Sequence, residues 1–129
     1  MIDVDNFKTI NDTYGYLSGD LALMDVANAL KAACNRNDYV VRYGGDEFFI
    51  LGYCSNILHI QKKIAIIENE IMFKNEQNVL PFSISLSIGY STSNENECKT
   101  VSALIKKVDD SMYEVKNIKK KRQESDSSY

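Results

Sequence analysis

Acidic residues at two places in the sequence are the side chains best suited to chemistry. Asp3 and Asp5 stand near the beginning of the chain, and Asp46 and Glu47 follow a pair of glycines. Carboxylate oxygens are ligands that Mg²⁺ prefers, usually one or two of them together with phosphate oxygens. If Asp3 and Asp46 converge, they repel each other unless a cation neutralises them. One hypothesis is therefore a metal site suited to phosphoryl transfer, in which a metal pair would bridge a triphosphate and activate a hydroxyl.

The same acids also have plainer interpretations. Asp3 and Asp5 alternate with apolar residues and so share one face of a strand, where charges at a sheet edge would discourage aggregation. Asp46 and Glu47 could be solvated residues beside a Gly-Gly-Asp turn. Adjacent strand residues point to opposite faces, so these two acids cannot hold one ligand at the same angle. Spacing alone leaves the metal site and the solvated acids both open.

A β-hairpin is the element that would position the second pair of acids. Two short apolar runs, at 39–43 and 47–51, flank the two glycines, and glycine adopts the positive φ of a tight turn without a Cβ penalty. The first strand, at 1–5, carries Asp3. In a βαββαβ sheet the first strand and the hairpin strands are commonly neighbours, so the turn can lie beside the end of the first strand. This arrangement would bring Asp3 and Asp46 together.

Hydrophobic periodicity predicts the other elements. The expected order is a strand at 1–5, a loop at 6–19 with at most one helical turn, a helix at 21–35 that Ser18 or Asp20 starts, hairpin strands at 39–43 and 47–51, a helix at about 56–73, a strand at 82–88 and a last helix that Thr100 caps. This is the βαββαβ pattern of a ferredoxin-like α/β sandwich, an α+β fold with an antiparallel hairpin and an extra helix.

Composition places the chain among ordinary globular domains. Its 129 residues are 44% hydrophobic and 26% charged, enough for one domain with a core, and the net charge of −3 argues for neither nucleic-acid nor membrane binding. No apolar run approaches the ~20 residues of a membrane span. Cys34, Cys54 and Cys98 lack zinc-site spacing and are expected to be reduced thiols. His59 is the only histidine, which excludes a histidine metal cluster or a His-based triad.

The sequence resembles the GGDEF family of diguanylate cyclases in motifs that span nearly the whole chain. The matching residues are Asp3-x-Asp5-Asn6-Phe7-Lys8-x-Ile10-Asn11-Asp12, Gly15-x-x-x-Gly19-Asp20, Arg42-Tyr43-Gly44-Gly45-Asp46-Glu47-Phe48, Ser87-Ile88-Gly89 and Asp109-Asp110-x-Met112-Tyr113-x-x-Lys116. The resemblance implies a palm-like nucleotidyl-cyclase fold and an enzyme that condenses two GTP into cyclic di-GMP and two pyrophosphates. It also implies that each domain binds one GTP and that two copies meet face to face as a homodimer.

The resemblance assigns metal and catalytic roles by position. Asp3 and Asp46 would hold Mg²⁺ or Mn²⁺, two ions per site, with help from the backbone carbonyl of Val4. Glu47 would lie near the metals and the reacting 3′-hydroxyl. Asp46 and Glu47 are therefore the expected catalytic residues, and Glu47 is also an expected metal-site residue.

Substrate-binding roles are implied in the same way. They fall on Phe7 and Lys8 for the phosphates, Asn11 and Asp20 for the guanine edge, Gly44 and Gly45 for close approach of the turn, and Lys116 and Lys120 for the terminal phosphates. The guanine assignment is chemically sensible, because a carboxylate accepts from N1–H and N2–H₂ while an amide both donates and accepts. Without the resemblance, Asp20 would be a helix N-cap, Asn11 an Asx-turn residue and Lys116 a solvated residue at a helix end.

Several positions depart from the family pattern. Tyr16 stands where histidine commonly follows the first-loop glycine. Lys120 replaces an arginine, and a point charge in place of a bidentate guanidinium would weaken the grip on phosphate. The family's inhibitory product site, Arg-x-x-Asp, aligns with Asn35 and Asp38, while Arg36 is shifted by one position, about 100° around a helix. We therefore expect no strong product inhibition through this site.

The family pattern also sets the expected domain bounds. Residues 1–122 would form a GGDEF domain that lacks its N-terminal helix, followed by a disordered tail at 123–129. The missing helix would leave apolar surface uncovered, so we expect lower stability than in a whole domain and some self-association. We also expect a cytoplasmic location, whether or not upstream regions tether the domain, and we allow for an upstream sensor domain as a partner.

Diguanylate cyclase activity is thus the leading functional hypothesis. The alternative is a GTP- or nucleotide-binding regulatory module without turnover, which Tyr16 and Lys120 favour slightly. A fold relative such as an adenylyl cyclase is a weaker third hypothesis, because Asn11 and Asp20 match guanine recognition. Turnover of GTP with Mg²⁺ separates the first two hypotheses, and the relative affinity for GTP and ATP decides the third.

Overall fold

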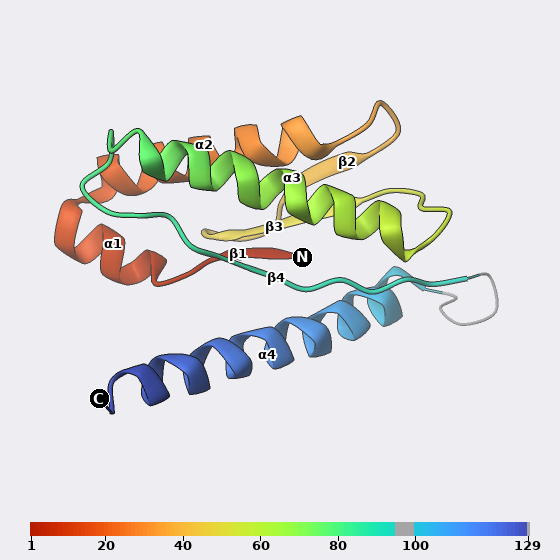
Figure 1. Cartoon of the computed structure of the whole chain (residues 1–129). Helices are drawn as coiled ribbons and strands as arrows, with labels where there is room; N and C mark the ends of the chain where they lie inside the picture. Colours follow the sequence, from red (N-terminus) through yellow and green to blue (C-terminus); the bar gives the residue numbers. More distant parts are fainter. Residues whose placement is uncertain (95–99, 129) are drawn as a thin grey trace. The chain divides into compact units, whose positions relative to one another are not determined.

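The computed structural model describes residues 1–94 and 100–128 (Figure 1). Its elements, in order, are β1 (Ile2–Val4), α1 (Phe7–Tyr14), α2 (Tyr16–Ala33), β2 (Tyr39–Arg42), β3 (Glu47–Leu51), α3 (Ile57–Glu76), β4 (Leu86–Ile88) and α4 (Val101–Asp126). Contacts divide the chain into two units: one is Ile2–Leu86, and the other is Met1 together with the residues from Ser87 onward.

An antiparallel sheet underlies the fold. Its strands follow the order β2-β3-β1-β4, and β1 and β2 are each antiparallel to β3. The predicted fold class, an α+β fold on a βαββαβ core with an antiparallel hairpin, is confirmed. Because β1 lies between β3 and β4 in this order, Asp3 is on an inner strand, and it is only 5% exposed. The interpretation of Asp3 as an edge-strand charge is therefore wrong.

The core of the Ile2–Leu86 unit lies between its strands and two helices. α2 and α3 contact each other and run side by side in Figure 1. The buried apolar residues of this unit are Ile2, Val4, Ile10, Ala22, Leu23, Val26, Ala29, Leu30, Ala33, Phe48, Ile67, Ile71 and Ile84. Each square ångström of apolar surface removed from water stabilises the fold by about 25 cal/mol. This burial holds in place the strands that carry the acids.

The segment at 6–19 was predicted to be a loop, and this prediction is wrong because most of the segment is helical. α1 follows Asn6, which has a left-handed backbone with φ 56°, and α2 follows Gly15, with φ 87°. Ile10 is buried, and tertiary packing of this kind outweighs the weak helix propensity of Asn, Asp and Thr. The positive φ of Gly15 makes a sharp bend between the two helices, which other residues adopt only with strain.

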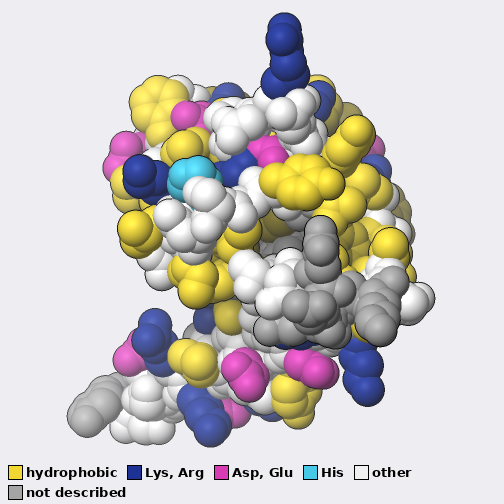
Figure 2. Space-filling model, turned by 90° about the vertical axis from the view of Figure 1, so that its right-hand side faces the viewer, with side chains coloured by type: hydrophobic (Ala, Val, Ile, Leu, Met, Phe, Trp, Pro, Cys, Tyr) yellow, Lys and Arg dark blue, Asp and Glu magenta, His cyan; other side chains and the backbone are white. Residues whose placement is uncertain are grey.

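The hairpin is confirmed at the predicted place, but its turn does not work as predicted. Gly15 is the one glycine with positive φ among the described residues, so the two glycines of the turn do not use the left-handed region. The hairpin buries one face only: Tyr39 and its cross-strand partner Leu51 are 70% and 53% exposed. Hydrophobic side chains also reach the surface on the face drawn in Figure 2. The single histidine, His59, lies there, with Nδ1 3.3 Å from Ser55 Oγ.

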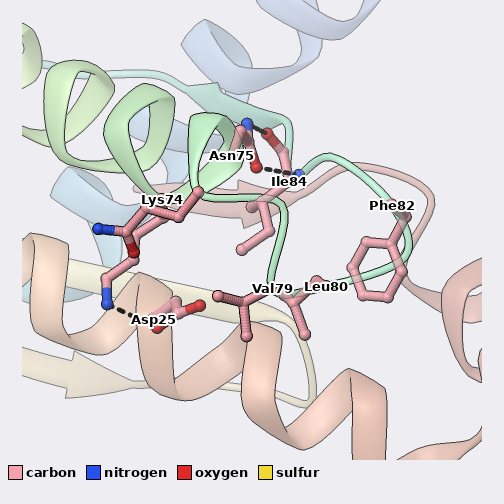
Figure 3. Close-up of a pocket in the computed structure, with 8 residues that line it drawn as sticks. Asp25, Lys74, Asn75, Val79, Leu80, Phe82 and Ile84 are labelled. Atoms are coloured by element: carbon pink, nitrogen blue, oxygen red, sulfur yellow. Dashed lines mark hydrogen bonds and ion pairs between the residues drawn. The ribbon is translucent and has the colours of Figure 1, made fainter.

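Asn75, near the end of α3, fixes the segment that leads to β4. Its amide nitrogen donates to the carbonyl of Ile84, and its amide oxygen accepts from the Ile84 N–H, both at 2.8 Å (Figure 3). The Asn75 side chain thus bonds both the N–H and the carbonyl of Ile84, which in a strand would bond to the backbone of a neighbouring strand. β4 accordingly contains only Leu86–Ile88 and is shorter than the strand predicted at 82–88. The helix predicted at about 56–73 is confirmed with a longer end, since α3 runs to Glu76 after its N-cap Asn56.

The unit formed by Met1 and the residues from Ser87 onward contains α4. Thr100 caps this helix as predicted, accepting from the Ala103 N–H at 3.1 Å. A Cβ at Gly89 would lie 2.8 Å from the backbone nitrogen of Met112, so only glycine allows this close approach to α4. α4 continues to Asp126, beyond residue 122 where the sequence placed the end of the domain. No helix within 1–94 and 100–128 is long and apolar enough to cross a membrane.

Candidate active site

The acids of β1 and of the hairpin meet at one end of the sheet. β1 pairs with β3 so that Asp3 lies opposite Glu47, and the Val4 N–H donates to the Asp46 carbonyl at 3.0 Å. The charge of Asp3 and a side-chain hydrogen bond with it both act on the pKa of Asp46, so the two carboxyl groups lie close together. The convergence that the sequence predicted for these two acids is therefore present, and it follows directly from the β1–β3 register.

The electrostatics of the acid pair favour a bound cation. Burial raises the pKa of the Asp46 carboxyl above its ordinary value, and the adjacent charge of Asp3 and the hydrogen bond to it raise this pKa further. Glu47 adds a smaller effect of the same sign. Carboxylates that share a site resist joint ionisation, and a cation between them removes that resistance.

The donor set around this pair suits a metal that also binds its substrate. In the part of the chain that the structure describes, no group of three or more His, Cys, Asp or Glu side chains is arranged to hold a metal ion. Mg²⁺ commonly takes one or two protein carboxylates and completes its shell with waters and substrate phosphates. Asp3 and Asp46 fit that pattern. The predicted roles of Glu47 and of the Val4 carbonyl as metal ligands stay predictions.

The turn beside the acids is open on one side. A Cβ added at Gly45 would meet nothing within 4 Å, whereas one at Gly44 would lie 3.3 Å from Glu47 Oε2. The Glu47 carbonyl accepts from the N–H groups of Tyr43 and Gly44, at 2.9 and 3.3 Å, which closes the turn. A ligand could therefore approach the backbone at Gly45 without displacing a side chain, while the role of Gly44 and Gly45 toward the nucleotide stays a prediction.

A cleft of about 360 Å³ lies on the helical side of the hairpin. Its lining consists of Asp20, Leu23, Met24, Ala27, Arg42 and Phe48. Apolar side chains thus form most of the wall, with one carboxylate and one guanidinium as the charged groups. A flat aromatic ring with polar edges is a ligand of matching chemistry.

Asn11 and Asp20 occupy positions that exclude their plainer interpretations. Asn11 lies inside α1, so it is not an Asx-turn residue, and Asp20 lies inside α2, whose N-cap is Gly15. The predicted start signal at Ser18 or Asp20 is therefore wrong. Asn11 Oδ1 is buried without a hydrogen-bond partner, in a space that a Cβ at Gly19 would fill. Asn11 is not part of the cleft lining, but Gly19 places it beside the helix that carries Asp20.

The other predicted substrate residues are spread over both units. Phe7 is half-buried, with its ring 3.4 Å from the position of a Cβ at Gly19, and Lys8 is exposed. Lys116 and Lys120 are exposed residues of α4, in the unit that does not hold the acid pair. Their roles stay predictions.

Sequence reasoning missed the part that Arg42 plays. Its Nε donates to the Gly44 carbonyl at 3.2 Å and its Nη2 to the Gly45 carbonyl at 2.8 Å. The sequence did contain a signal for this role, because an arginine directly before a glycine-rich turn can donate to turn carbonyls that have no partner in the β-ladder.

A buried ion pair between Asp38 and Lys63 was also missed. The Asp38 side chain is 3% exposed, and its Oδ2 accepts from Lys63 Nζ and, at 2.7 Å, from the Asn35 N–H. Burial works against ionisation of Asp38, but these hydrogen bonds and the Lys63 charge hold its pKa below the ordinary value. Burial and Asp38 raise the pKa of the free thiol of Cys34. Cys54 is also free, and Cys98 lies outside the described residues.

Comparison with known proteins decides the family. A family model described as "Diguanylate cyclase, GGDEF domain" matches residues 1–122. The chain belongs to the GGDEF family.

Relatives of this GGDEF domain carry different names. Diguanylate cyclase A of Treponema denticola is 32% identical over 121 residues, which are 90% of this chain and 31% of that protein. Cyclic di-GMP phosphodiesterase PdeR of Escherichia coli K12 is 30% identical over 115 residues, 89% of this chain and 17% of that protein. The solved GGDEF domain of YfiN (also TpbB) from Pseudomonas aeruginosa is 29% identical with a TM-score of 0.73, covering 90% of this chain and 73% of that one. The chain spans about a third or less of the curated relatives' length.

Proposed function

We propose that this GGDEF domain is the catalytic domain of a diguanylate cyclase, which condenses two GTP into cyclic di-GMP and releases two pyrophosphates. The observation that carries the proposal is the contact between the carboxyl groups of Asp3 and Asp46 at the end of the β1–β3 ladder, beside an open turn. Membership of the family supports the same reaction.

The chain's own residues would orient GTP and move one proton. Asp3 and Asp46 would hold Mg²⁺ or Mn²⁺, which supplies neutralisation of the triphosphate charge when bound. Glu47, opposite Asp3 in the ladder, would lie near the attacking 3′-hydroxyl and accept its proton. That oxygen would form a bond to the α-phosphorus of the opposing GTP as the bond to pyrophosphate breaks. Positioning and charge neutralisation would supply most of the rate.

Guanine recognition would come from α1 and α2. The side-chain oxygen of Asn11 is buried beside Gly19 and has no hydrogen-bond partner among the described residues, so this amide would turn toward the cleft to accept a ligand N–H. Asp20, on the wall of the cleft, would accept from guanine N1–H and N2–H₂, which adenine cannot offer together. We infer a preference for GTP over ATP, which supports a cyclase for guanine rather than adenine nucleotides.

Incubation with GTP and Mg²⁺, with product separation by chromatography, tests the proposal. Cyclic di-GMP should form with the natural sequence and disappear in Asp46→Ala. Asp12→Ala is the matched control, because Asp12 is an exposed acid of α1 and its loss should leave the product yield unchanged. Absence of product from the natural sequence, alone and within its full-length protein, would contradict the proposal.

The second candidate is a regulatory module that binds GTP without turnover. Lys120 in place of arginine and Tyr16, which is 78% exposed at the start of α2, favour it slightly. The phosphodiesterase name of one relative also keeps it open. Tight GTP binding without cyclic di-GMP would select this candidate.

We also propose that the product does not inhibit strongly through the loop before β2. Asp38, the acid that the family pattern would use, is engaged by Lys63 and by the Asn35 N–H. A ligand would have to displace a buried ion pair to reach it, which is costly. Titration with cyclic di-GMP checks this, and tight binding that Asp38→Ala abolishes would contradict it.

A further inference from the structure

Arg42 holds the turn that carries Asp46. It is the last residue of β2, and its guanidinium donates to two consecutive carbonyls, Gly44 at 3.2 Å and Gly45 at 2.8 Å. The N–H groups of a guanidinium diverge at fixed angles, so one planar head can serve two separate acceptors. These two carbonyls therefore have partners although the ladder does not reach them.

The neighbouring carbonyls are held by other parts of the sheet. The Asp46 carbonyl accepts from the Val4 N–H at 3.0 Å, and the Glu47 carbonyl accepts from Tyr43 and Gly44. Four successive carbonyls from 44 to 47 are thus bonded, the first two to Arg42. The backbone of Asp46 is consequently fixed by Arg42 on one side and by β1 on the other.

The same guanidinium also borders the cleft. Arg42 lines it together with Asp20, Met24 and Phe48, among other residues. Within 1–94 and 100–128, no carboxylate forms a salt bridge with Arg42, and its partners are neutral carbonyls. Arg42 thus has no ion pair among the described residues, although Asp20 lines the same cleft.

The geometry points to Arg42 as a positioning residue that fixes the glycine turn and thereby keeps the Asp46 carboxyl beside that of Asp3. Its role in turnover rests on the proposed function, whereas its hold on the turn does not. Lysine cannot replace it, because a single ammonium on a flexible stem lacks the planar fork that spans both carbonyls. The loss of either bond would loosen the turn on the side away from β1, so that only the Val4 N–H would still hold the backbone of Asp46.

Amide hydrogen exchange followed by NMR tests the hold on the turn directly. Arg42→Lys and Arg42→Ala should each raise the exchange rates of the Tyr43 and Gly44 amides by about tenfold, the effect of losing a hydrogen bond of about 1.4 kcal/mol. Arg36→Lys and Arg36→Ala are matched controls, because Arg36 is exposed outside regular structure. Exchange rates within twofold of the natural protein in both Arg42 variants overturn the proposal.

Metal titration and kinetics test the consequence for the acids. Mn²⁺ affinity should fall about tenfold in Arg42→Lys, as when a residue that orients a ligand is lost. In turnover, kcat should fall while the KM for GTP changes less than twofold. An Arg42→Lys variant with slow exchange but lost turnover would place the guanidinium on substrate and overturn the positioning role. If the natural protein neither binds Mn²⁺ nor converts GTP, the proposed function fails, and the exchange rates still decide the role of Arg42.

Discussion

Replacing Asp46 by asparagine should stabilise the protein when no metal ion is present. The asparagine side chain would keep the size and most of the hydrogen-bonding capacity of the aspartate but remove its charge. In the natural protein, burial and the nearby charge of Asp3 raise the pKa of Asp46, so ionisation of this carboxyl disfavours the folded state. Substitution of this proposed catalytic residue is thus expected to raise the free energy of unfolding, whereas most point mutations lower it.

Coulomb's law gives an upper bound on the gain. Unit charges roughly 4 Å apart repel by about 4 kcal/mol at an effective dielectric constant of 20. Asp46 is only partly buried, so solvent screens much of this repulsion. We expect Asp46→Asn to raise the free energy of unfolding by about 1 kcal/mol at neutral pH.

The pH dependence fixes the sign of the effect. A carboxyl whose pKa is raised in the folded state stabilises the fold while it is protonated, and this contribution is lost as the pH rises from the unfolded value of about 3.9 through the higher folded value. The difference between Asp46→Asn and the natural protein should therefore vanish well below a pH of about 3.9. It should grow as the pH rises and become constant once Asp46 is ionised.

Urea unfolding with EDTA and with Mn²⁺ measures both halves of the prediction. Saturation at about 100 times the dissociation constant would stabilise the natural protein by about 2.7 kcal/mol, and Asp46→Asn should lose this gain. Asp12→Asn, with the same change of charge at an exposed site, should behave like the natural protein. A variant that is less stable in EDTA, or that keeps the full Mn²⁺ gain, would refute the reasoning.

Two further substitutions probe the parts that support the site. Asp38→Asn leaves Lys63 without its carboxylate and should cost about 3 kcal/mol by urea unfolding at pH 7. Because the folded pKa of Asp38 is lowered, this cost should disappear as the pH falls below about 3.9 and through the lower folded pKa. A cost independent of pH would contradict the ion-pair explanation. Gly19→Ala places a methyl group on Asn11 Oδ1, so it should lower the free energy of unfolding by about 1–3 kcal/mol and weaken GTP binding in a calorimetric titration. Gly45→Ala meets open space and should change the free energy of unfolding by less than about 0.5 kcal/mol. Equal effects of the two substitutions would show that the contact with Asn11 is unimportant.

Strong periodicity and turn chemistry explain what the sequence predicted well. The hairpin, α3 and the cap of α4 were recognisable because apolar spacing and capping residues are local signals. The convergence of Asp3 and Asp46 followed once the first strand was taken as a neighbour of the hairpin. Family resemblance supplied the candidate roles of Asn11 and Asp20, which spacing alone would have given to a turn and a cap.

The remaining features depend on contacts between distant residues, which leave little trace in local sequence. α1 is polar enough to resemble a loop, and its helix is secured by the burial of Ile10. β4 is short because the Asn75 side chain takes the polar groups of Ile84, and nothing near residue 84 indicates that partner. The ion pair of Asp38 with Lys63 likewise joins the loop before β2 to α3, across the whole hairpin in sequence.

The double hydrogen bond between Asn75 and Ile84 also bears on how this domain can vary over evolutionary time. It anchors Ile84, two residues before β4, to the end of α3, so the intervening loop is fixed at both ends. An insertion or deletion between residues 78 and 83 would be absorbed before Ile84, without a shift in the alignment of Leu86 within the sheet. Length differences among homologous domains should therefore be tolerated on the α3 side of Ile84 and be rare between Ile84 and Leu86.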